Sequence, residues 1–468
     1  MWKRILRDVL VGAAGAALVA AVIYYTPYLR KWAKRSVGGA VGRGGASSME
    51  VEQARVAEKK LYPESPPLTP VEDWPRWRGP RADGISREDV NESAFSAAGP
   101  KVLWSADVGL GYSSPVASAG KVFLFSLIGT RGEGAKSKEC LTAFDAATGR
   151  ILWNAEGGPG YTDSYGGTRS TPAIDGQRIY TYGGMGELTC RDTATGKPVW
   201  QINVLKALNA EGPGYGCASN PLIDGDLLYV QGGKPKDESG AGGGTAVAVN
   251  KNTGAITWIS EAKTVAGYAM PVMTDAGGQR QLVIFAGDAV YGTDPATGRT
   301  LWKEPWETGS EVNSSTPVYR DGHLFVTSDY GKGCMMMEIS PAGEKKLWEN
   351  TDIESRFPQT ILDGDSLYAN SEGILKCMAW PDGKIRWQKR ASSDRIGLGG
   401  SLTRVANGKL LLMTERGKLR LATADANNLK VLAEKDLFEG EDIWSVPLVY
   451  GGRIYAKGQA EFVCLGAR

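Results

Sequence analysis

Histidine is almost absent from this chain: His323 is the only one in 468 residues, and it follows a turn, Asp321-Gly322. Metal sites built on several histidines and Ser-His-Asp triads need more than that, so both are nearly excluded. Paired cysteines are also lacking. The six cysteines are scattered, with no adjacent pair and no C-x-x-C motif, which excludes covalently attached c-type haem.

Neither sign of charge dominates. Lys and Arg number 54 against 52 Asp and Glu, a net formal charge of +2. Such a chain has no bulk attraction for a polyanion, so we expect no nucleic-acid partner. The 62 glycines and 14 tryptophans instead indicate many tight turns between short, aromatic-rich strands.

One long apolar stretch lies near the N-terminus. Residues 9–25 carry no charge, and Tyr28 and Leu29 extend the stretch to about 20 residues, enough for a helix to cross a bilayer. The alternatives are a cleaved signal peptide or a buried helix, but a signal's apolar region is usually shorter and ends in small residues. We therefore predict an uncleaved single-pass membrane anchor over residues 1–35.

Basic residues flank both ends of this stretch, three before it and four after it. By the positive-inside rule alone, that count leans slightly toward a cytoplasmic C-terminal region. For residues 36–72 we predict a flexible Pro/Gly-rich linker that tethers the C-terminal region. Within it, glycines give way to a stretch with the composition of a short charged helix, residues 49–61, and then to prolines typical of an extended spacer.

From Lys101 onward one pattern recurs, and its first landmark is a two-residue turn between apolar runs. Asp-Gly and Asn-Gly are strong hairpin signals because both residues must accept positive φ. Successive turns lie about 42 to 56 residues apart, within the range of propeller blades. The eight turns are Ala119-Gly120, Asp175-Gly176, Asp224-Gly225, Gly277-Gly278, Asp321-Gly322, Asp363-Gly364, Asn407-Gly408 and Gly451-Gly452.

The second landmark is an Asp-x-x-Thr-Gly turn followed four residues later by tryptophan. The Asp side chain can bond its own backbone two residues on, and Gly takes the left-handed position. The chain then reverses into an outer strand whose tryptophan lies across the neighbouring sheet. The good copies end at Trp153, Trp200, Trp258 and Trp302, and weaker copies end at Trp348 and Trp387. Cys190, Cys377 and Cys464 share one place in the repeat, which favours a buried packing position over disulfides, although an even count permits them.

The two ends of the repeat region are complementary. The last repeat runs out of chain before its outermost strand, whereas the strand around Trp104 has no blade of its own, and the seventh repeat has lost its tryptophan. We predict that the Trp104 strand completes the eighth blade, because closure removes exposed sheet edges. The predicted fold is therefore all-β, an eight-bladed β-propeller over residues 101–468 with one N-terminal transmembrane helix, and residues 73–100 form a pre-propeller segment.

These repeats resemble the pyrroloquinoline-quinone (PQQ) repeat family, the quinoprotein alcohol dehydrogenase-like propellers. Within it they are most similar to the PQQ-binding-like β-propeller proteins. Three passages carry this resemblance: Asp73-Trp74-Pro75-Arg76-Trp77-Arg78-Gly79-Pro80, Gly109-Leu110-Gly111-Tyr112-Ser113-Ser114-Pro115 and Thr171-Pro172-Ala173-Ile174-Asp175-Gly176. The resemblance covers residues 73–468, and the family includes both enzymes and non-enzymatic scaffolds. It also implies an extracytoplasmic or periplasmic propeller, opposite to the side that the charge count favours.

In such propellers the residues just before each innermost strand line one mouth of the central channel. Candidates here are Tyr112, Arg169, Tyr215, Asn220, Tyr268, Glu311, Asn313, Arg356, Arg395, Asp442 and Trp444. In a quinone site, Arg169, Arg356 or Arg395 would clamp the carboxylates of PQQ. Glu311 with Asn220 or Asn313 would ligate Ca²⁺, Asp442 would act as base and Trp444 would stack on the quinone.

The competing interpretation is that these polar residues satisfy backbone groups at the blade edges. Enzymes of the family commonly set an adjacent-cysteine disulfide against the quinone, and this chain has no adjacent cysteines. We therefore expect a membrane-anchored scaffold that binds a peptide or protein. A PQQ-dependent dehydrogenase of an alcohol or sugar is the alternative. Trp74, Trp77 and Arg78 either contact a partner or, as we favour, pack the pre-propeller segment against the ring.

Overall fold

The computed structural model describes residues 57–61, 68–95, 99–129, 137–163, 165–236, 241–357, 360–389, 396–439 and 442–468. All of them belong to one compact unit that begins at Gln53. The predicted membrane-spanning segment, residues 9–29, lies outside the described residues. Within the described ranges, none of the helices has the length and apolar character needed to cross a membrane.

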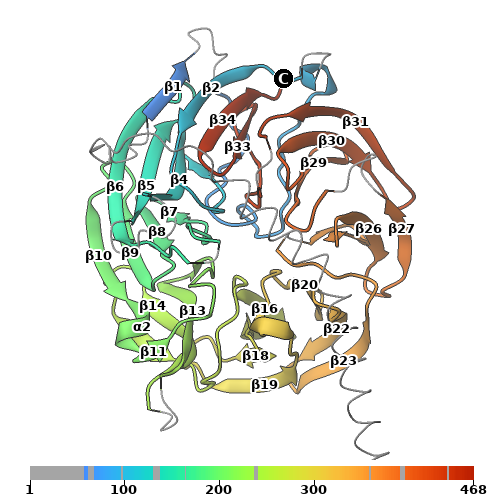
Figure 1. Cartoon of the computed structure of the whole chain (residues 1–468). Helices are drawn as coiled ribbons and strands as arrows, with labels where there is room; N and C mark the ends of the chain where they lie inside the picture. Colours follow the sequence, from blue (N-terminus) through green and yellow to red (C-terminus); the bar gives the residue numbers. More distant parts are fainter. Residues whose placement is uncertain are drawn as a thin grey trace, which may run out of the picture. The chain divides into compact units, whose positions relative to one another are not determined.

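Eight antiparallel sheets stand around a central axis, so the eight-bladed propeller is confirmed (Figure 1). In each of the first seven blades the strands follow chain order from the axis outward. Blade one has β3 (Val116–Ser118), β4 (Lys121–Ile128), β5 (Lys138–Asp145) and β6 (Ile151–Pro159); blade two has β7 (Ala173–Asp175), β8 (Arg178–Tyr182), β9 (Glu187–Asp192) and β10 (Pro198–Asn203); blade three has β12 (Leu222–Asp224), β13 (Leu227–Pro235), β14 (Gly244–Asn250) and β15 (Ile256–Ile259); blade four has β16 (Val272–Ala276), β17 (Gln279–Phe285), β18 (Ala289–Thr293) and β19 (Thr300–Pro305).

The remaining blades repeat this order. Blade five has β20 (Val318–Arg320), β21 (His323–Ser328), β22 (Gly333–Ser340) and β23 (Gly343–Asn350); blade six has β24 (Ile361–Asp363), β25 (Ser366–Ser371), β26 (Ile374–Ala379) and β27 (Ile385–Lys389); blade seven has β28 (Ser401–Val405), β29 (Lys409–Met413), β30 (Lys418–Ala424) and β31 (Leu429–Asp436); blade eight begins with β32 (Leu448–Val449), β33 (Arg453–Lys457) and β34 (Glu461–Gly466). Short additions are α2 (Val204–Ala207), β11 (Ala210–Glu211), η1 (Glu92–Phe95) and η3 (Gly309–Glu311).

The predicted ring closure is also confirmed. Strand β2 (Val102–Asp107) pairs antiparallel with β34, which places Trp104 opposite Cys464. A further strand, β1 (Ala57–Leu61), pairs with the outer edge of β2. This corrects the expectation of a helix over residues 49–61 for the part that the structure describes: an edge strand offers free backbone groups, and this stretch pairs with them.

The hairpin turns differ in register from the prediction at three of the eight places. Five pairs, such as Ala119-Gly120, have positive φ at both residues. At the other three, Asp175, Asp224 and Asp363 end the inner strand, and the following glycine is the first residue of the turn. Glycine is the residue that a type II′ turn requires at that place, so the same dipeptide serves two turn types.

Each outer-strand tryptophan contacts the next blade. The indole Nε1 of Trp104 donates to the carbonyl oxygen of Ala146 at 3.3 Å, in the first turn of the Asp-x-x-Thr-Gly type. Trp153, Trp200, Trp258, Trp348 and Trp387 donate in the same way to the corresponding turns of the following blades. Each of these six rings lies opposite a third-strand residue that has an aromatic residue on its other side. Three of these third-strand residues are Cys190, Cys377 and Cys464. Every cysteine of the chain is buried and forms no disulfide.

Residues 73–95, here called the capping segment, cross the ring at the turn ends of the innermost strands. Trp74 exchanges backbone hydrogen bonds with Ala117 of blade one. Trp77 Nε1 donates to Thr316 Oγ1 at 3.1 Å near blade five. The buried Glu88 carboxylate accepts the N–H groups of the Gly451-Gly452 turn in blade eight, each at 2.7 Å. Trp74 and Trp77 therefore pack this segment against the ring, as the sequence favoured.

Two glycine substitutions test the tryptophan contact. Gly149 (φ +77°) and Gly120 (φ +75°) share a left-handed backbone, but a Cβ on Gly149 would lie 2.5 Å from the Trp104 ring, whereas a Cβ on Gly120 has nothing within 4 Å. Gly120→Ala should lower the free energy of unfolding by about 1–2 kcal/mol, because alanine is strained in the left-handed conformation. Gly149→Ala should lower the free energy of unfolding by several kcal/mol, because its Cβ also forces the Trp104 ring away from the turn. Urea denaturation of both variants measures this, and equal midpoints would refute the docking role of Trp104.

Candidate functional site

The loops that lead into the innermost strands converge at one mouth of the ring, at the end opposite the capping segment. They carry every residue predicted for this mouth that lies in the described ranges. Arg395 lies outside the described residues. The remaining predicted residues fall into two groups: an aromatic and arginine cluster, and residues that hold the backbone.

Trp444 lies at the centre of the cluster. Its ring stacks on Tyr112 from blade one, with centroids 4.0 Å apart and planes 20° apart. It also stacks on Phe357, which precedes blade six, at 4.3 Å and 27°. The indole Nε1 donates to Glu415 Oε1 at 3.1 Å. A ring has two faces, and two close stacked neighbours occupy both of them, so Trp444 is held in place and has no free face.

Arg169 ties the loops of blades two and three together. Its guanidinium donates to the carbonyl oxygens of Tyr215 and Tyr165, each at 2.6 Å. The same group lies 4.8 Å from the ring centroid of Tyr161 and 5.9 Å from that of Tyr112. Such contacts combine hydrogen bonding with cation–π attraction and fix the planar guanidinium.

Arg356 plays the matching part between blades five and six. Its Nε forms an ion pair with Asp329 Oδ2 at 2.5 Å. The guanidinium also lies over the ring of Tyr330, 4.6 Å from its centroid. Asp329, Glu354 and Glu372 bring carboxylate oxygens within 4.8 Å of one another. Burial, and then Glu372 and Asp329, raise the pKa of Glu354, while a hydrogen bond from the Gly331 N–H opposes the shift.

We call this assembly the aromatic mouth. It consists of Tyr112, Tyr161, Tyr165, Tyr215, Tyr268, Tyr330, Phe357, Trp444, Arg169 and Arg356. Most of it is half-buried or buried, but Tyr165 and Tyr330 are 47% and 43% exposed. Both have positive φ, +58° and +68°, which is uncommon for a bulky side chain.

The residues proposed as calcium ligands serve the backbone. Asn313 is fully buried and donates to the carbonyl oxygen of Ala286 at 2.7 Å, while its own Oδ1 accepts from Ser328. Asn220 Oδ1 accepts the Thr171 N–H at 2.5 Å. Glu311 is exposed at the end of η3. The asparagine oxygens are thus already used as hydrogen-bond acceptors, which is the role that the competing interpretation gives them.

Asp442, the predicted base, is half-buried two residues before Trp444, and its backbone oxygen accepts from Gln459 Nε2 at 2.6 Å. A quinone site would need an open aromatic face, arginines free to bind the carboxylates of PQQ, and oxygen ligands free to bind Ca²⁺. Here both faces of Trp444 are covered by other rings. Arg169 donates to backbone carbonyls and Arg356 pairs with a carboxylate. The two asparagine side chains form hydrogen bonds with backbone groups. Within the part of the mouth that the structure describes, the side chains as they stand do not fit the quinone.

Several members of the aromatic mouth were absent from the sequence-based set, namely Tyr161, Tyr165, Tyr330 and Phe357, as was Glu415, which accepts the Trp444 hydrogen bond. A signal for one of them exists. A Gly-Tyr pair precedes four innermost strands, at Tyr112, Tyr161, Tyr215 and Tyr268, and only Tyr161 of these was not chosen. Tyr330 lies in a turn between β21 and β22, which the repeat pattern does not mark as part of this mouth.

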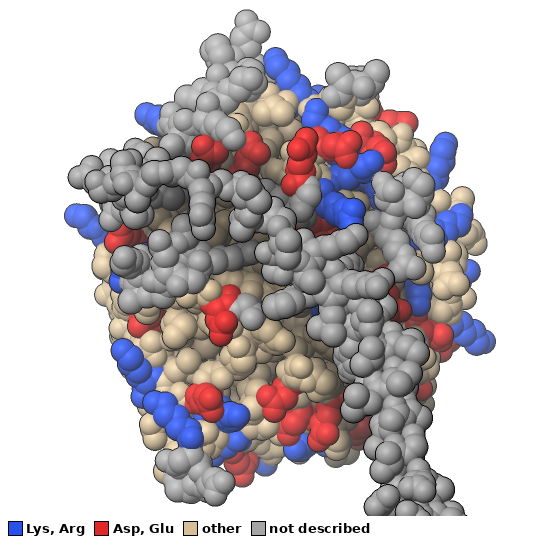
Figure 2. Space-filling model, viewed as in Figure 1, with Lys and Arg blue, Asp and Glu red and all other residues tan. Residues whose placement is uncertain are grey.

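On the face drawn in Figure 2, charge does not single out a binding surface. On the side of the ring seen in Figure 2, acidic and basic side chains of the described residues stand beside one another, and neither sign forms a continuous field. A site for a polyanion needs a basic stripe or patch. The aromatic mouth is distinguished by its side-chain types and by the positive φ of Tyr165 and Tyr330.

Comparison with solved structures supports the fold. BamB from Moraxella catarrhalis superposes with a TM-score of 0.53 at 15% identity, over 78% of this chain and 99% of that one. A computationally designed protein, Ika8, gives 0.53 at 10% identity, over 77% and 97%. Quinohemoprotein alcohol dehydrogenase from Comamonas testosteroni gives 0.48 at 13% identity, over 86% and 81%, a likeness from which we draw nothing further. None of the curated proteins matches this chain.

A family model described as outer membrane protein assembly factor BamB matches residues 89–206 and 137–389. The two matches overlap and together run over more than half of the chain. They cover blades one to six, in which the turn and tryptophan landmarks recur. The chain therefore belongs to this BamB-type family of PQQ-like β-propellers.

Proposed function

We propose that this protein is a membrane-anchored interaction module that binds a peptide or protein partner at the aromatic mouth. One observation carries the proposal: Tyr165 and Tyr330 are exposed and share a left-handed backbone conformation at the same mouth. Strained residues persist only where the surrounding structure enforces them, and they cluster at binding and catalytic sites. The fold therefore holds two large aromatic side chains in solvent-exposed positions.

The chemistry of the mouth suits a protein partner. Tyrosine, tryptophan and arginine are the residues that most often dominate binding energy at protein interfaces. Arg169 and Arg356 hold the surrounding rings in place, so few side chains lose freedom when a partner binds. The family is described as an assembly factor of outer membrane proteins, and by analogy the partner of this chain is another protein.

The N-terminal segment supplies the location. We propose that residues 9–29 span the membrane and that the tether displays the propeller on the extracytoplasmic side.

The enzyme alternative is a PQQ-dependent dehydrogenase. When bound with Ca²⁺, the quinone would supply the oxidising chemistry for an alcohol or sugar. The stacked position of Trp444 between Tyr112 and Phe357 argues against it, because neither face of the Trp444 ring is open to a quinone.

Photo-crosslinking tests the mouth as a partner site. A benzoylphenylalanine at position 165 or 330 should form adducts in cells, identified by mass spectrometry. The same residue at position 347 should not, because Leu347 is 40% exposed but lies on the outer strand β23. Tyr165→Ala and Tyr330→Ala should each weaken recovery of the same partner by roughly tenfold or more. Adducts at 347 alone would contradict the proposal.

Membrane extraction tests the anchor. The whole chain should stay in the membrane fraction through a high-salt wash, whereas Leu18→Arg should release it, because arginine at a helix centre costs about 3 kcal/mol on insertion. A protease added outside the cytoplasmic membrane should digest the propeller. Retention of the Leu18→Arg chain in the membrane fraction would contradict the membrane anchor. Complete protection of the propeller from the protease would contradict its extracytoplasmic location.

Titration with PQQ and Ca²⁺ tests the enzyme alternative. We expect no change in the absorption spectrum of the protein and no dye reduction when alcohols are added, because side chains fill the stacking position. Trp444→Ala opens the space between Tyr112 and Phe357 and is the matched variant for this steric argument. Stoichiometric binding by the unmodified chain, with dye reduction, would instead establish the dehydrogenase.

A further inference from the structure

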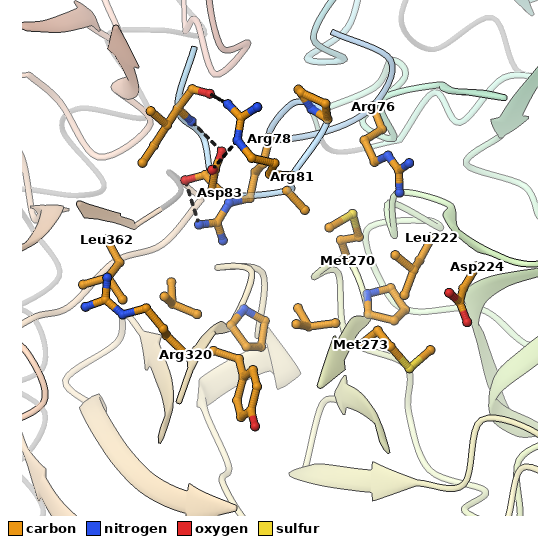
Figure 3. A pocket seen from close by; sticks show the side chains of 18 of the residues that line it. Arg76, Arg78, Arg81, Asp83, Leu222, Asp224, Met270, Met273, Arg320 and Leu362 are labelled. Carbon is orange, nitrogen blue, oxygen red and sulfur yellow. Dashed lines mark hydrogen bonds and ion pairs between the residues drawn. The ribbon is translucent and has the colours of Figure 1, made fainter. Parts of the chain in front are cut away.

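A cavity of about 550 Å³ lies between the capping segment and the ring, at the far ends of the innermost strands from the aromatic mouth (Figure 3). On the ring side it is lined by residues 222–224, 270–273, 317–320 and 362–364, from blades three to six. Residues 76–85 form its other wall. Its volume is in the range of sites for small organic ligands.

Two arginines of the capping segment point into this space. Figure 3 shows Arg76 and Arg78 descending from the segment toward the apolar floor. Arg78 is 3% exposed, and its guanidinium reaches only backbone carbonyls, with Thr360 O at 2.8 Å as the shortest contact. Among the described residues, the Nε atoms of Arg76 and Arg78 have no hydrogen-bond partner although both are buried. Buried unsatisfied donors are rare in native proteins and point to a missing partner.

The carboxylates that line the cavity do not fill that role. Asp83 pairs with Arg81 at 3.0 Å, Asp224 with Arg280 at 2.8 Å and Asp363 with Arg404 at 2.7 Å. Each of these acids therefore has its own cation, whereas no ion pair within the described ranges involves Arg76 or Arg78. Burial lowers the pKa of Arg78 to about 10, so the group stays charged at neutral pH.

Arg320 and Tyr319 are the other polar side chains of the wall, and the remainder is apolar. Leu222, Met270, Met273 and Leu362 face the arginines across the cavity (Figure 3). An arginine offers paired donors that match carboxylate and phosphate oxygens. A ligand that satisfies both halves of this cavity has an anionic head and an apolar body.

We propose that this cavity binds a small organic anion, whose head group is held by Arg76 and Arg78 and whose apolar body lies against Leu222, Met270, Met273 and Leu362. Both the capping segment and blades three to six contribute side chains to the site. It is independent of the partner site at the aromatic mouth.

Calorimetric titration tests this with hexanoate and hexyl phosphate, which share a body and differ in their head groups, and with hexanol, which lacks the charge. At least one of the two anions should bind at a single site, and hexanol should bind at least tenfold more weakly, about 1.4 kcal/mol. The preferred anion identifies the head group as carboxylate or phosphate. Absence of saturable binding by both anions near 1 mM, a weak affinity on the usual scale, or equal binding of hexanol, would overturn the proposal.

Variants of the capping segment locate the site. Arg76→Met should weaken the bound anion at least tenfold, and Arg76→Lys should weaken it less because the charge remains. Arg81→Met is the matched control: this arginine lines the same cavity but is already paired with Glu72 and Asp83. Circular dichroism checks that each variant is folded. Equal losses from Arg76→Met and Arg81→Met would show a general charge effect and refute the site.

Discussion

The hydrogen bond from an outer-strand indole to the turn of the next blade is the interaction on which the ring depends. In six blades the tryptophan Nε1 donates to a backbone carbonyl of the neighbouring turn. The ring lies over a turn glycine in most of these, as Trp153 does over Gly196 and Trp200 over Gly254. The third-strand residue opposite the indole is alanine or cysteine in five of these blades and Met336 in blade five, so cysteine recurs there as a packing residue.

The two outer strands that break this rule do so for a structural reason. Blade seven carries Ala433 at the tryptophan position, and the blade that follows has no turn to receive an indole, because its strands β34 and β2 come from opposite ends of the chain. In blade four, Trp302 instead donates to Gln281 Oε1, and Gln281 Nε2 donates to Ser340 O in the atypical Pro-Ala turn of blade five. A glutamine thus bridges the gap that the turn leaves.

Periodicity explains how much of this structure could be predicted. Turns and tryptophans recur in nearly every blade, so blade number and closure through Trp104 followed from the sequence. Turn register did not, since Asp-Gly suits two turn types that differ by one residue. The aromatic mouth was found only in part, because it is built from loops that do not repeat: Phe357 and Tyr330 reach Trp444 and Arg356 by tertiary folding alone. The capping segment showed its packing role in Trp74 and Trp77, but the unpaired Nε atoms of Arg76 and Arg78 appear only once burial is known.

The separation of stability from recognition follows from this geometry. The indole contacts lie on the outer strands, far from the axis, and they hold neighbouring blades together without using the axial loops. The innermost strands are mostly three residues long, about 10 Å at 3.3 Å per residue, and each ends in two loops that the indole network leaves free to vary. One set of loops forms the aromatic mouth. At the other end the capping segment brings Arg76 and Arg78 to the ends of the innermost strands. Glu88 and Trp74 fix that segment to blades eight and one. A ligand bound beneath it would add to the contacts between the segment and blades three to six, where Trp77 and Arg78 supply the hydrogen bonds from the segment.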